Sequence, residues 1–229
     1  MNSQHPPLYQ TLGEVAGIWM IANAGYYVVL PILGFDLSYN NAPFVIAAYF
    51  FAWFLIAVTA FKGTLDALLF ENRLWVYAAV ILGAGLVLPA LLVQLTTLPV
   101  PYSVDPSRYV DILFATPWYF LPKVADILLQ QTLIATLILA LAAHMRSVKN
   151  ISYTYALLFG GAHVALFALS GTSTPYATVM TTGALLSAAI FPYLILRVRS
   201  GFMYAFMLHL LFYIALALTL HAWPPPYIV

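Results

Sequence analysis

Long apolar stretches, separated by short polar segments, run along the whole of this chain of 229 residues. A helix needs about 20 mainly apolar residues to cross the hydrocarbon core of a bilayer. Seven stretches have about this length, and we expect each to be a transmembrane helix: 15–35, 43–61, 74–98, 122–144, 151–171, 175–196 and 201–221. The pattern therefore predicts an all-α polytopic membrane protein with about seven transmembrane helices in a single membrane domain, 1–229.

Polar and proline-rich segments connect and flank these stretches. Residues 1–14 are expected to form an N-terminal tail, and residues 222–229 a C-terminal tail. Residues 62–73 carry charges with apolar residues between them, which favours a position at the membrane surface. Proline and turn residues predict a loop over 99–111. Residues 112–121 are apolar but too short to cross alone, so we expect an interfacial segment there.

The composition supports a membrane protein and excludes several classes of function. The chain is 64% hydrophobic and 7% charged, whereas soluble domains contain about 25% charged residues. A net charge of +1 indicates no nucleic-acid partner. The chain contains no cysteine, which excludes disulfides, thiolate nucleophiles and iron–sulfur clusters. No basic residue precedes the first apolar stretch, so we expect that stretch to be retained as a helix rather than cleaved as a signal peptide.

The basic residues predict an orientation in the bilayer. With seven crossings, one side carries Lys62, Arg73, Arg146, Lys149, Arg197 and Arg199, and the other carries Arg108 and Lys123. Cytoplasmic loops are enriched in Lys and Arg. We therefore expect a cytoplasmic N-terminus and a C-terminus on the opposite side, in a bacterial-type inner membrane.

Polar residues in the middle of three apolar stretches are the candidate functional residues. Gln130 and Gln131 lie in stretch 122–144, His163 in the next one, and His209 in the last. At 1.5 Å per residue all four lie roughly 12–20 Å below one face of the membrane. Intramembrane polar groups usually face the helix bundle and pair with one another. We expect one buried cluster, with Asp126 one helical turn from Gln130.

The order of these residues resembles a known family. An FxxxH motif is present as Phe159-Gly-Gly-Ala-His163, and Ser200 to His209 contains a small turn, an aromatic residue, an apolar run and a histidine. Together with the basic connector 144–149, this is similar to the CAAX protease and bacteriocin-processing (CPBP, or Abi) family of intramembrane peptidases. That family carries EExxxR, FxxxH and HxxxN motifs on successive helices. The resemblance implies a CPBP-like helical core over 122–221, with 15–111 as peripheral helices and loop.

The chain departs from the family at the positions that carry the chemistry. Gln130 and Gln131 stand where the family has glutamates, Ala135 where it has arginine, and Tyr213 where it has asparagine. A glutamine amide cannot accept a proton near neutral pH and is a poor metal ligand. The resemblance therefore implies a degenerate member, a pseudoprotease without hydrolytic activity, metal or cofactor. We expect a scaffold or accessory subunit that has other membrane proteins as partners.

Two alternatives remain open at this point. Asp126 could act as a displaced carboxylate with His163 and His209, giving an active intramembrane peptidase or a zinc site; the competing interpretation makes Asp126 a partner of Lys123. Alternatively, the histidines could ligate a haem or pigment. Zinc or haem is expected only under these alternatives.

Overall fold

The computed structural model describes residues 7–69, 83, 112, 115–116, 118–170 and 174–222. These residues are mainly helical and contain no strand. The helices are α1 (Leu8–Ala24), the π-helix η1 (Gly25–Val29), α2 (Leu30–Ile32), α3 (Pro43–Ala60), α4 (Lys62–Leu69), α6 (Phe120–His144), α7 (Val148–Tyr155), the π-helix η5 (Ala156–Gly160), α8 (Gly161–Ser170), α9 (Thr174–Arg197) and α10 (Gly201–Ala222).

Six helical segments in this part of the chain are long and apolar enough to cross a membrane. They are Leu8–Ile32, Pro43–Ala60, Phe120–His144, Val148–Ala168, Ala177–Arg197 and Gly201–Leu220. The prediction of an all-α membrane protein is confirmed at this level. The predicted helix 74–98 lies outside the described residues apart from Gly83, and so does most of 99–117.

The first helix begins earlier than its apolar pattern predicts. α1 starts at Leu8, so residues 8–14 of the predicted tail are helical. Gln10 donates a hydrogen bond from Nε2 to Oε1 of Glu14, at 2.9 Å and one helical turn away. Polar pairs four residues apart stabilise a helix end that contacts water. Apolarity marks the part of a helix that lies in hydrocarbon, whereas the helix itself can extend beyond it.

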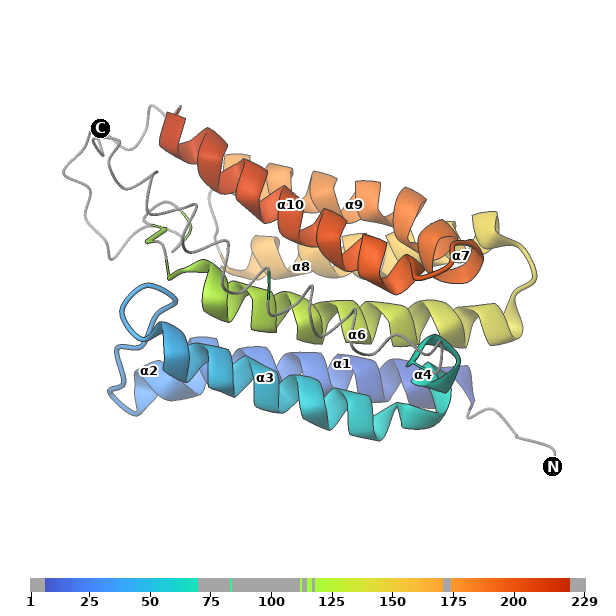
Figure 1. Cartoon of the computed structure of the whole chain (residues 1–229), viewed down its shortest axis with the longest axis horizontal. Coiled ribbons are helices and arrows are strands. Elements are labelled where there is room, and N and C mark those ends of the chain that lie inside the picture. The colour runs from blue at the N-terminus through green and yellow to red at the C-terminus, as the bar shows by residue number, and fades with distance from the viewer. Residues whose placement is uncertain are drawn as a thin grey trace.

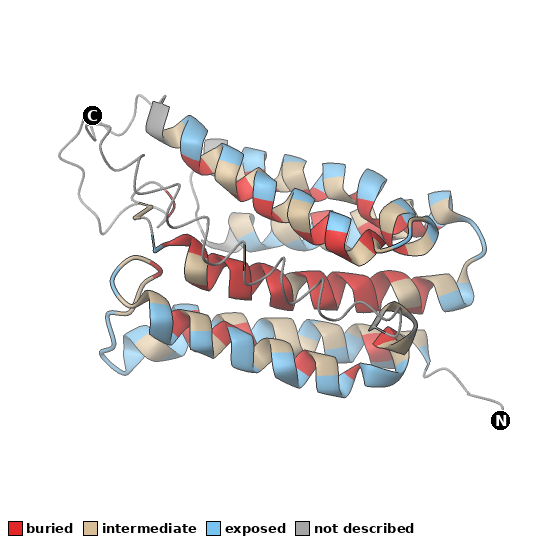
Figure 2. Cartoon of the chain, viewed as in Figure 1, coloured by how far each residue is buried: buried red, intermediate tan, exposed pale blue. Residues whose placement is uncertain are grey.

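α6 forms the centre of the bundle (Figures 1 and 2). α1 and α3 pack on one side of it, while α9 and α10 lie on the other side with α7 and α8. Within its membrane-crossing window 89% of the α6 residues are buried, against 11% for the first span and 33% for the last. A helix with apolar residues on every side is typical of a position in the centre of a bundle, where other helices cover all its sides. The polar side chains of α6 are therefore held inside protein rather than in lipid.

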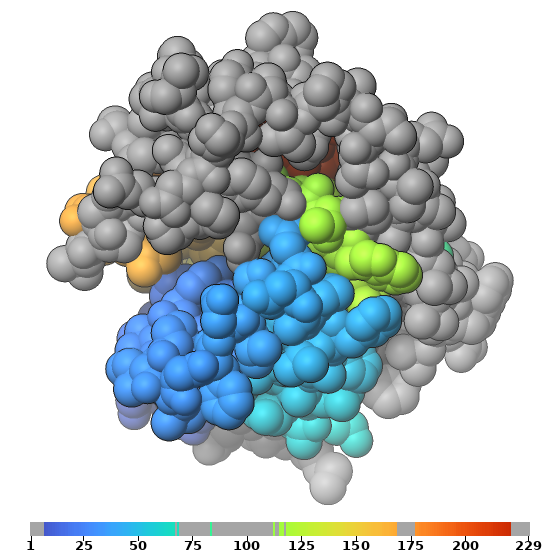
Figure 3. All heavy atoms as spheres, turned by 90° about the vertical axis from the view of Figure 1, so that its left-hand side faces the viewer, coloured from blue at the N-terminus to red at the C-terminus, as the bar shows by residue number. Residues whose placement is uncertain are grey.

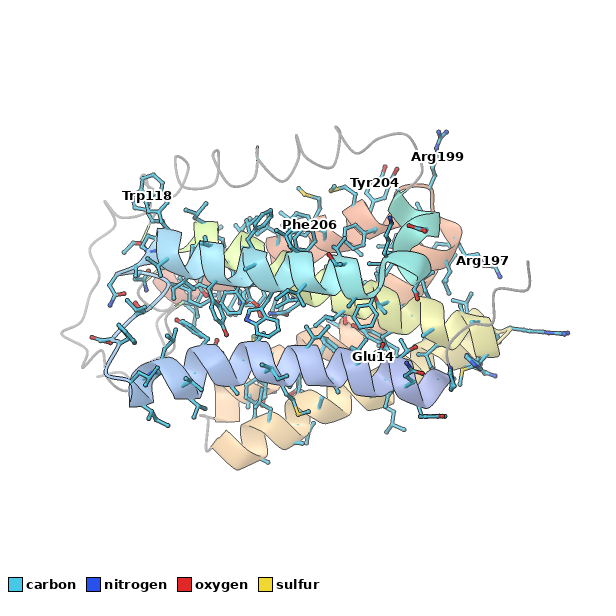
Figure 4. The ribbon with its side chains drawn as sticks, turned by 90° about the horizontal axis from the view of Figure 1, so that it is seen from below. Glu14, Trp118, Arg197, Arg199, Tyr204 and Phe206 are labelled. Atoms are coloured by element: carbon cyan, nitrogen blue, oxygen red, sulfur yellow. The ribbon has the colours of Figure 1, made fainter. Side chains whose placement is uncertain are left out.

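The long helices run parallel or antiparallel to one another, with α3 and α6 in the same direction, so their termini collect at two ends of the bundle (Figure 1). Lys62, Arg146, Lys149, Arg197 and Arg199 adjoin the helix termini at one end. Arg197 and Arg199 lie far from Trp118, which marks the opposite end, while Glu14 lies toward the basic end (Figure 4). The chain thus has a basic end, defined by these five residues, and an opposite end that contains the loop from Leu33 to Ala42.

Two glycines permit close helix contacts near the polar centre. A Cβ on Gly25 would collide with the Tyr49 hydroxyl, which donates a 2.8 Å hydrogen bond to the Ala22 carbonyl. A Cβ on Gly183 would lie 2.8 Å from the ring of Phe212. Small residues of this kind let helices approach closely in membranes. Gly25, the first residue of η1, lies against α3, and Gly183 joins α9 to α10.

Candidate functional site

Asp126, on the second turn of α6, is the acceptor at the centre of a buried polar network. Its Oδ2 lies 2.9 Å from Nζ of Lys123 and accepts a 3.1 Å hydrogen bond from the hydroxyl of Tyr39. Its Oδ1 accepts a 2.7 Å hydrogen bond from Nε2 of Gln130. The side chains of Lys123 and Asp126 are 8% and 6% exposed, respectively. We call Tyr39, Lys123, Asp126 and Gln130 the Asp126 network.

Aromatic rings enclose the positive charge of this network. Lys123 Nζ lies 3.8 Å from the centroid of the Tyr213 ring and 5.6 Å from that of Tyr39. A cation over an aromatic face is attracted by the ring quadrupole, and the attraction increases when water is excluded. Burial, and then the Asp126 carboxylate, raise the pKa of the Tyr39 hydroxyl well above its usual range. Tyr39 therefore remains a hydrogen-bond donor to Asp126 at neutral pH.

The loop from Leu33 to Ala42 brings Tyr39 to α6. Asn40 in this loop accepts a 2.9 Å hydrogen bond at Oδ1 from the backbone nitrogen of Thr116, just before α6. Tyr39 also packs against Tyr119, with ring centroids 5.4 Å apart. Viewed from this end of the bundle, the loop region in blue adjoins the yellow-green start of α6 (Figure 3). The network therefore joins the N-terminal helices to the centre of the bundle.

A second site, the histidine cavity, lies between α6, α8, α9 and α10. It has a volume of about 200 Å³. Its polar lining residues are Gln130, His163, Ser187, His209 and Tyr213. The remaining lining is apolar and consists of Phe159, Met180, Gly183, Ala184, Leu186, Ile190, Phe191, Leu208 and Phe212. Gln130 belongs to both sites, and the Tyr213 ring of the cavity lining also faces Lys123, so the Asp126 network and the histidine cavity are neighbours.

The two histidines are held in different ways. Nδ1 of His163 lies 2.8 Å from the backbone carbonyl of Phe159, and the Phe159 ring meets the imidazole edge-on at 4.6 Å. His209 stacks on Tyr213, with ring centroids 5.6 Å apart and planes inclined by 27°. Within the described part of the chain, the buried Nδ1 of His209 has no hydrogen-bond partner. His163 is thus fixed by its own helix, whereas the His209 ring packs against Tyr213 on the next turn.

Gln131 is separated from the cluster in which the sequence places it. Its side chain is 0% exposed, it does not line the histidine cavity, and neither its Oε1 nor its Nε2 has a hydrogen-bond partner among the described residues. Adjacent helical residues point about 100° apart. Because Gln130 faces the cavity, Gln131 points toward a different side of α6.

The structure thus sorts the predicted site residues into three groups. Gln130, His163, His209 and Tyr213 share one cavity. Asp126 is outside the cavity lining and bonds to Lys123. Of the two interpretations of Asp126 given above, this contact agrees with the one that pairs it with Lys123. Gln131 belongs to neither site.

Sequence reasoning missed two contributors to these sites. Tyr39 lies in a loop 87 residues before Asp126, and no local pattern distinguishes it from the other tyrosines of the chain. Ser187 lines the cavity but donates its hydroxyl to the Ala184 carbonyl at 2.7 Å. The contact of Lys123 with Asp126, in contrast, can be predicted from the sequence, because a lysine three residues before an aspartate in a helix can reach it.

The described residues supply too few donors for a metal centre. Among the described residues, no group of three or more His, Asp or Glu side chains could hold a metal ion. A zinc site needs three or four such ligands, and the cavity supplies two imidazoles.

No family model, no curated protein and no solved structure matches this chain. The resemblance to the CPBP peptidases therefore rests on the motifs quoted above.

Proposed function

We propose that this chain is a non-hydrolytic, CPBP-like integral membrane protein that acts as a scaffold or accessory subunit of a membrane complex. The proposal rests on the hydrogen bonding of Asp126. Its two carboxylate oxygens accept hydrogen bonds from Lys123, Tyr39 and Gln130. Peptide hydrolysis needs a positioned group that accepts the proton of the attacking water. Here the carboxylate on the same helical face as the glutamine is used for an ion pair.

The histidines support the same proposal. The Asp126/His163/His209 alternative requires the carboxylate of Asp126 to bond at least one of the two imidazoles. In the described residues, His163 bonds a carbonyl of its own helix and His209 has no Nδ1 partner. An active Asp126/His163/His209 peptidase is therefore disfavoured by the geometry.

The haem or pigment alternative is also disfavoured. The cavity of about 200 Å³ is smaller than the roughly 300–1,000 Å³ typical of pockets for drug-sized ligands. A macrocycle would need the surrounding helices to separate. An absorbance spectrum without a visible band is the expected result for the purified protein.

Two measurements test the proposal together. Affinity purification from native membranes in mild detergent should recover a defined membrane-protein partner in constant stoichiometry. Peptide-cleavage assays on the same preparation should give equal background rates for the wild type and for the His163→Ala/His209→Ala double variant. A monomer without a partner contradicts the scaffold role, and cleavage that disappears in the double variant contradicts the loss of hydrolysis.

We also propose a seventh crossing over 74–98 and a cytoplasmic basic end. α3 ends at the basic end whereas α6 begins at the opposite end, which supports one further crossing between them. The clustering of basic residues at one end supports its cytoplasmic placement.

The absence of native cysteines allows a direct test of orientation. Asn150→Cys, at the basic end, should react with a membrane-impermeant maleimide only after the membrane is opened. Asn41→Cys, at the opposite end, should react in intact cells. The reverse labelling pattern would invert the proposed orientation.

A further inference from the structure

His163 offers a hydrogen-bond acceptor to the histidine cavity. Nδ1 of His163 lies 2.8 Å from a carbonyl oxygen, and a carbonyl can only accept, so Nδ1 carries the proton. A neutral imidazole has one donor and one acceptor, and a charged ring within the hydrocarbon region is costly. The remaining nitrogen of His163, Nε2, is therefore an acceptor.

Gln130 adds a second acceptor to the same cavity. Its Nε2 donates to Oδ1 of Asp126 at 2.7 Å, and this fixes the orientation of the amide because an ionised carboxylate cannot donate. The carbonyl oxygen, Oε1, then remains as an acceptor of Gln130, beside the second hydrogen of Nε2. An occupant that satisfies these acceptors must bring a hydrogen-bond donor.

The occupant should also accept a hydrogen bond and carry no charge. His209 lines the same cavity, and its neutral imidazole carries one N–H donor. A cation is disfavoured because the neighbouring carboxylate of Asp126 already pairs with Lys123. One uncharged group that both donates and accepts is a hydroxyl.

The mouth of the cavity indicates that this hydroxyl belongs to a lipid-soluble molecule. The lining residues Leu186 and Ile190 on α9 and Leu208 on α10 are 60%, 43% and 43% exposed, respectively. All three lie within membrane-crossing segments. Entry is therefore from hydrocarbon. A volume of about 200 Å³ exceeds the roughly 150 Å³ of an apolar cavity that holds benzene.

We propose that the histidine cavity binds a neutral, lipid-soluble alcohol or phenol. Its hydroxyl donates to Nε2 of His163 and accepts from the N–H of the His209 imidazole. The apolar body packs against Met180, Phe191 and Phe212 and continues through the mouth into lipid. This site goes beyond the proposed scaffold role and does not depend on it, since the cavity can be filled with or without a partner protein.

Photolabelling in phosphatidylcholine nanodiscs tests the site. The probe is a fatty alcohol with a diazirine in its chain, and the matched probe is its methyl ether, which lacks the donor. The alcohol should label peptides of α9 and α10 in a saturable way, and about tenfold more strongly than the ether, as expected for the loss of one hydrogen bond. Equal labelling by both probes, or labelling confined to other helices, overturns the proposal.

Matched variants separate the cavity from general effects on the protein. His163→Phe and His209→Phe should each reduce saturable labelling about tenfold. His144→Phe should not, although His144 makes the same contact with its own helix, from Nδ1 to the Ala140 carbonyl at 2.9 Å. If His144→Phe reduces labelling as much, the histidine cavity is not the site.

A second pair of variants remains informative if the histidine variants fail to fold. Leu208→Trp changes an exposed residue at the mouth and should reduce labelling by closing it. Leu211→Trp changes a residue of the same helix that is 51% exposed and outside the lining, and should have no effect. Unchanged labelling in Leu208→Trp, or a cavity that holds water only, contradicts the proposal.

Discussion

The Asp126 network and the histidine cavity adjoin each other at Gln130, yet their hydrogen bonding differs. In the network, both carboxylate oxygens of Asp126 have donors and Lys123 has a carboxylate and an aromatic face. In the cavity, a buried nitrogen of His209 has no partner among the described residues. A satisfied buried network rigidifies a fold, whereas unsatisfied groups around an open volume can bind a ligand. The first site therefore serves architecture and the second serves recognition.

The largest expected effect comes from removing the acceptor of the Asp126 network. Asp126→Ala removes the carboxylate that pairs with the buried ammonium of Lys123, and breaking a buried pair costs about 3–5 kcal/mol. The thermal unfolding midpoint in detergent should fall accordingly. The double variant Lys123→Met/Asp126→Ala should recover most of the loss, because no buried charge remains unpaired. A double variant as unstable as the single one would show that the ion pair is not the source of the effect.

A gain in stability is expected at Gln131, which belongs to neither site. Both of its polar side-chain atoms are buried without partners among the described residues, and each such group costs about 1–3 kcal/mol. Gln131→Met keeps the volume and should raise the unfolding midpoint. Gln130→Met is the matched control on the adjacent position, and it should lower the midpoint because it removes the hydrogen bond to Asp126. A loss of stability in Gln131→Met would indicate a partner for this amide in the native membrane.

A smaller effect is expected at the loop that contacts the network. Tyr39→Phe removes one hydrogen bond to a charged acceptor and keeps the ring, so it should cost about 1.5 kcal/mol. Limited proteolysis should then cleave the loop from Leu33 to Ala42 faster than in the wild type. The variant Tyr9→Phe, on an exposed ring of α1, should leave both the midpoint and the cleavage rate unchanged.

The smallest expected effect is on the alkaline limit of stability. In the folded protein the pKa of Tyr39 is raised well above its usual range by burial and by Asp126, while the unfolded chain titrates near the usual value of about 10. The stability contributed by protonated Tyr39 is therefore complete below about pH 10 and is lost as the pH rises above that value. The difference in unfolding midpoint between the wild type and Tyr39→Phe should shrink from pH 9 to pH 11 on this basis. A constant difference across that range would contradict the role of the hydroxyl.

The division between the two sites shows where the sequence is sufficient for prediction. It places Gln130, His163 and His209 in three membrane-crossing helices at similar depth, because rise per residue and helix direction set depth. The structure brings these residues to one cavity. It also separates Gln131 from Gln130, because the rotation of α6 about its own axis depends on which neighbours surround it. The rotation of α6 cannot be predicted from the period of its apolar residues, because these residues occur on every side of the helix.

The sequence by itself determined that this is a helical membrane protein with polar residues held within its crossings, because hydrocarbon tolerates only helices whose polar groups face protein. The tertiary structure alone decided that Asp126 pairs with Lys123 and Tyr39 rather than with the histidines, since that choice depends on a loop contact 87 residues away. Depth in a membrane is a property of one helix, whereas partnership between side chains is a property of the packed bundle.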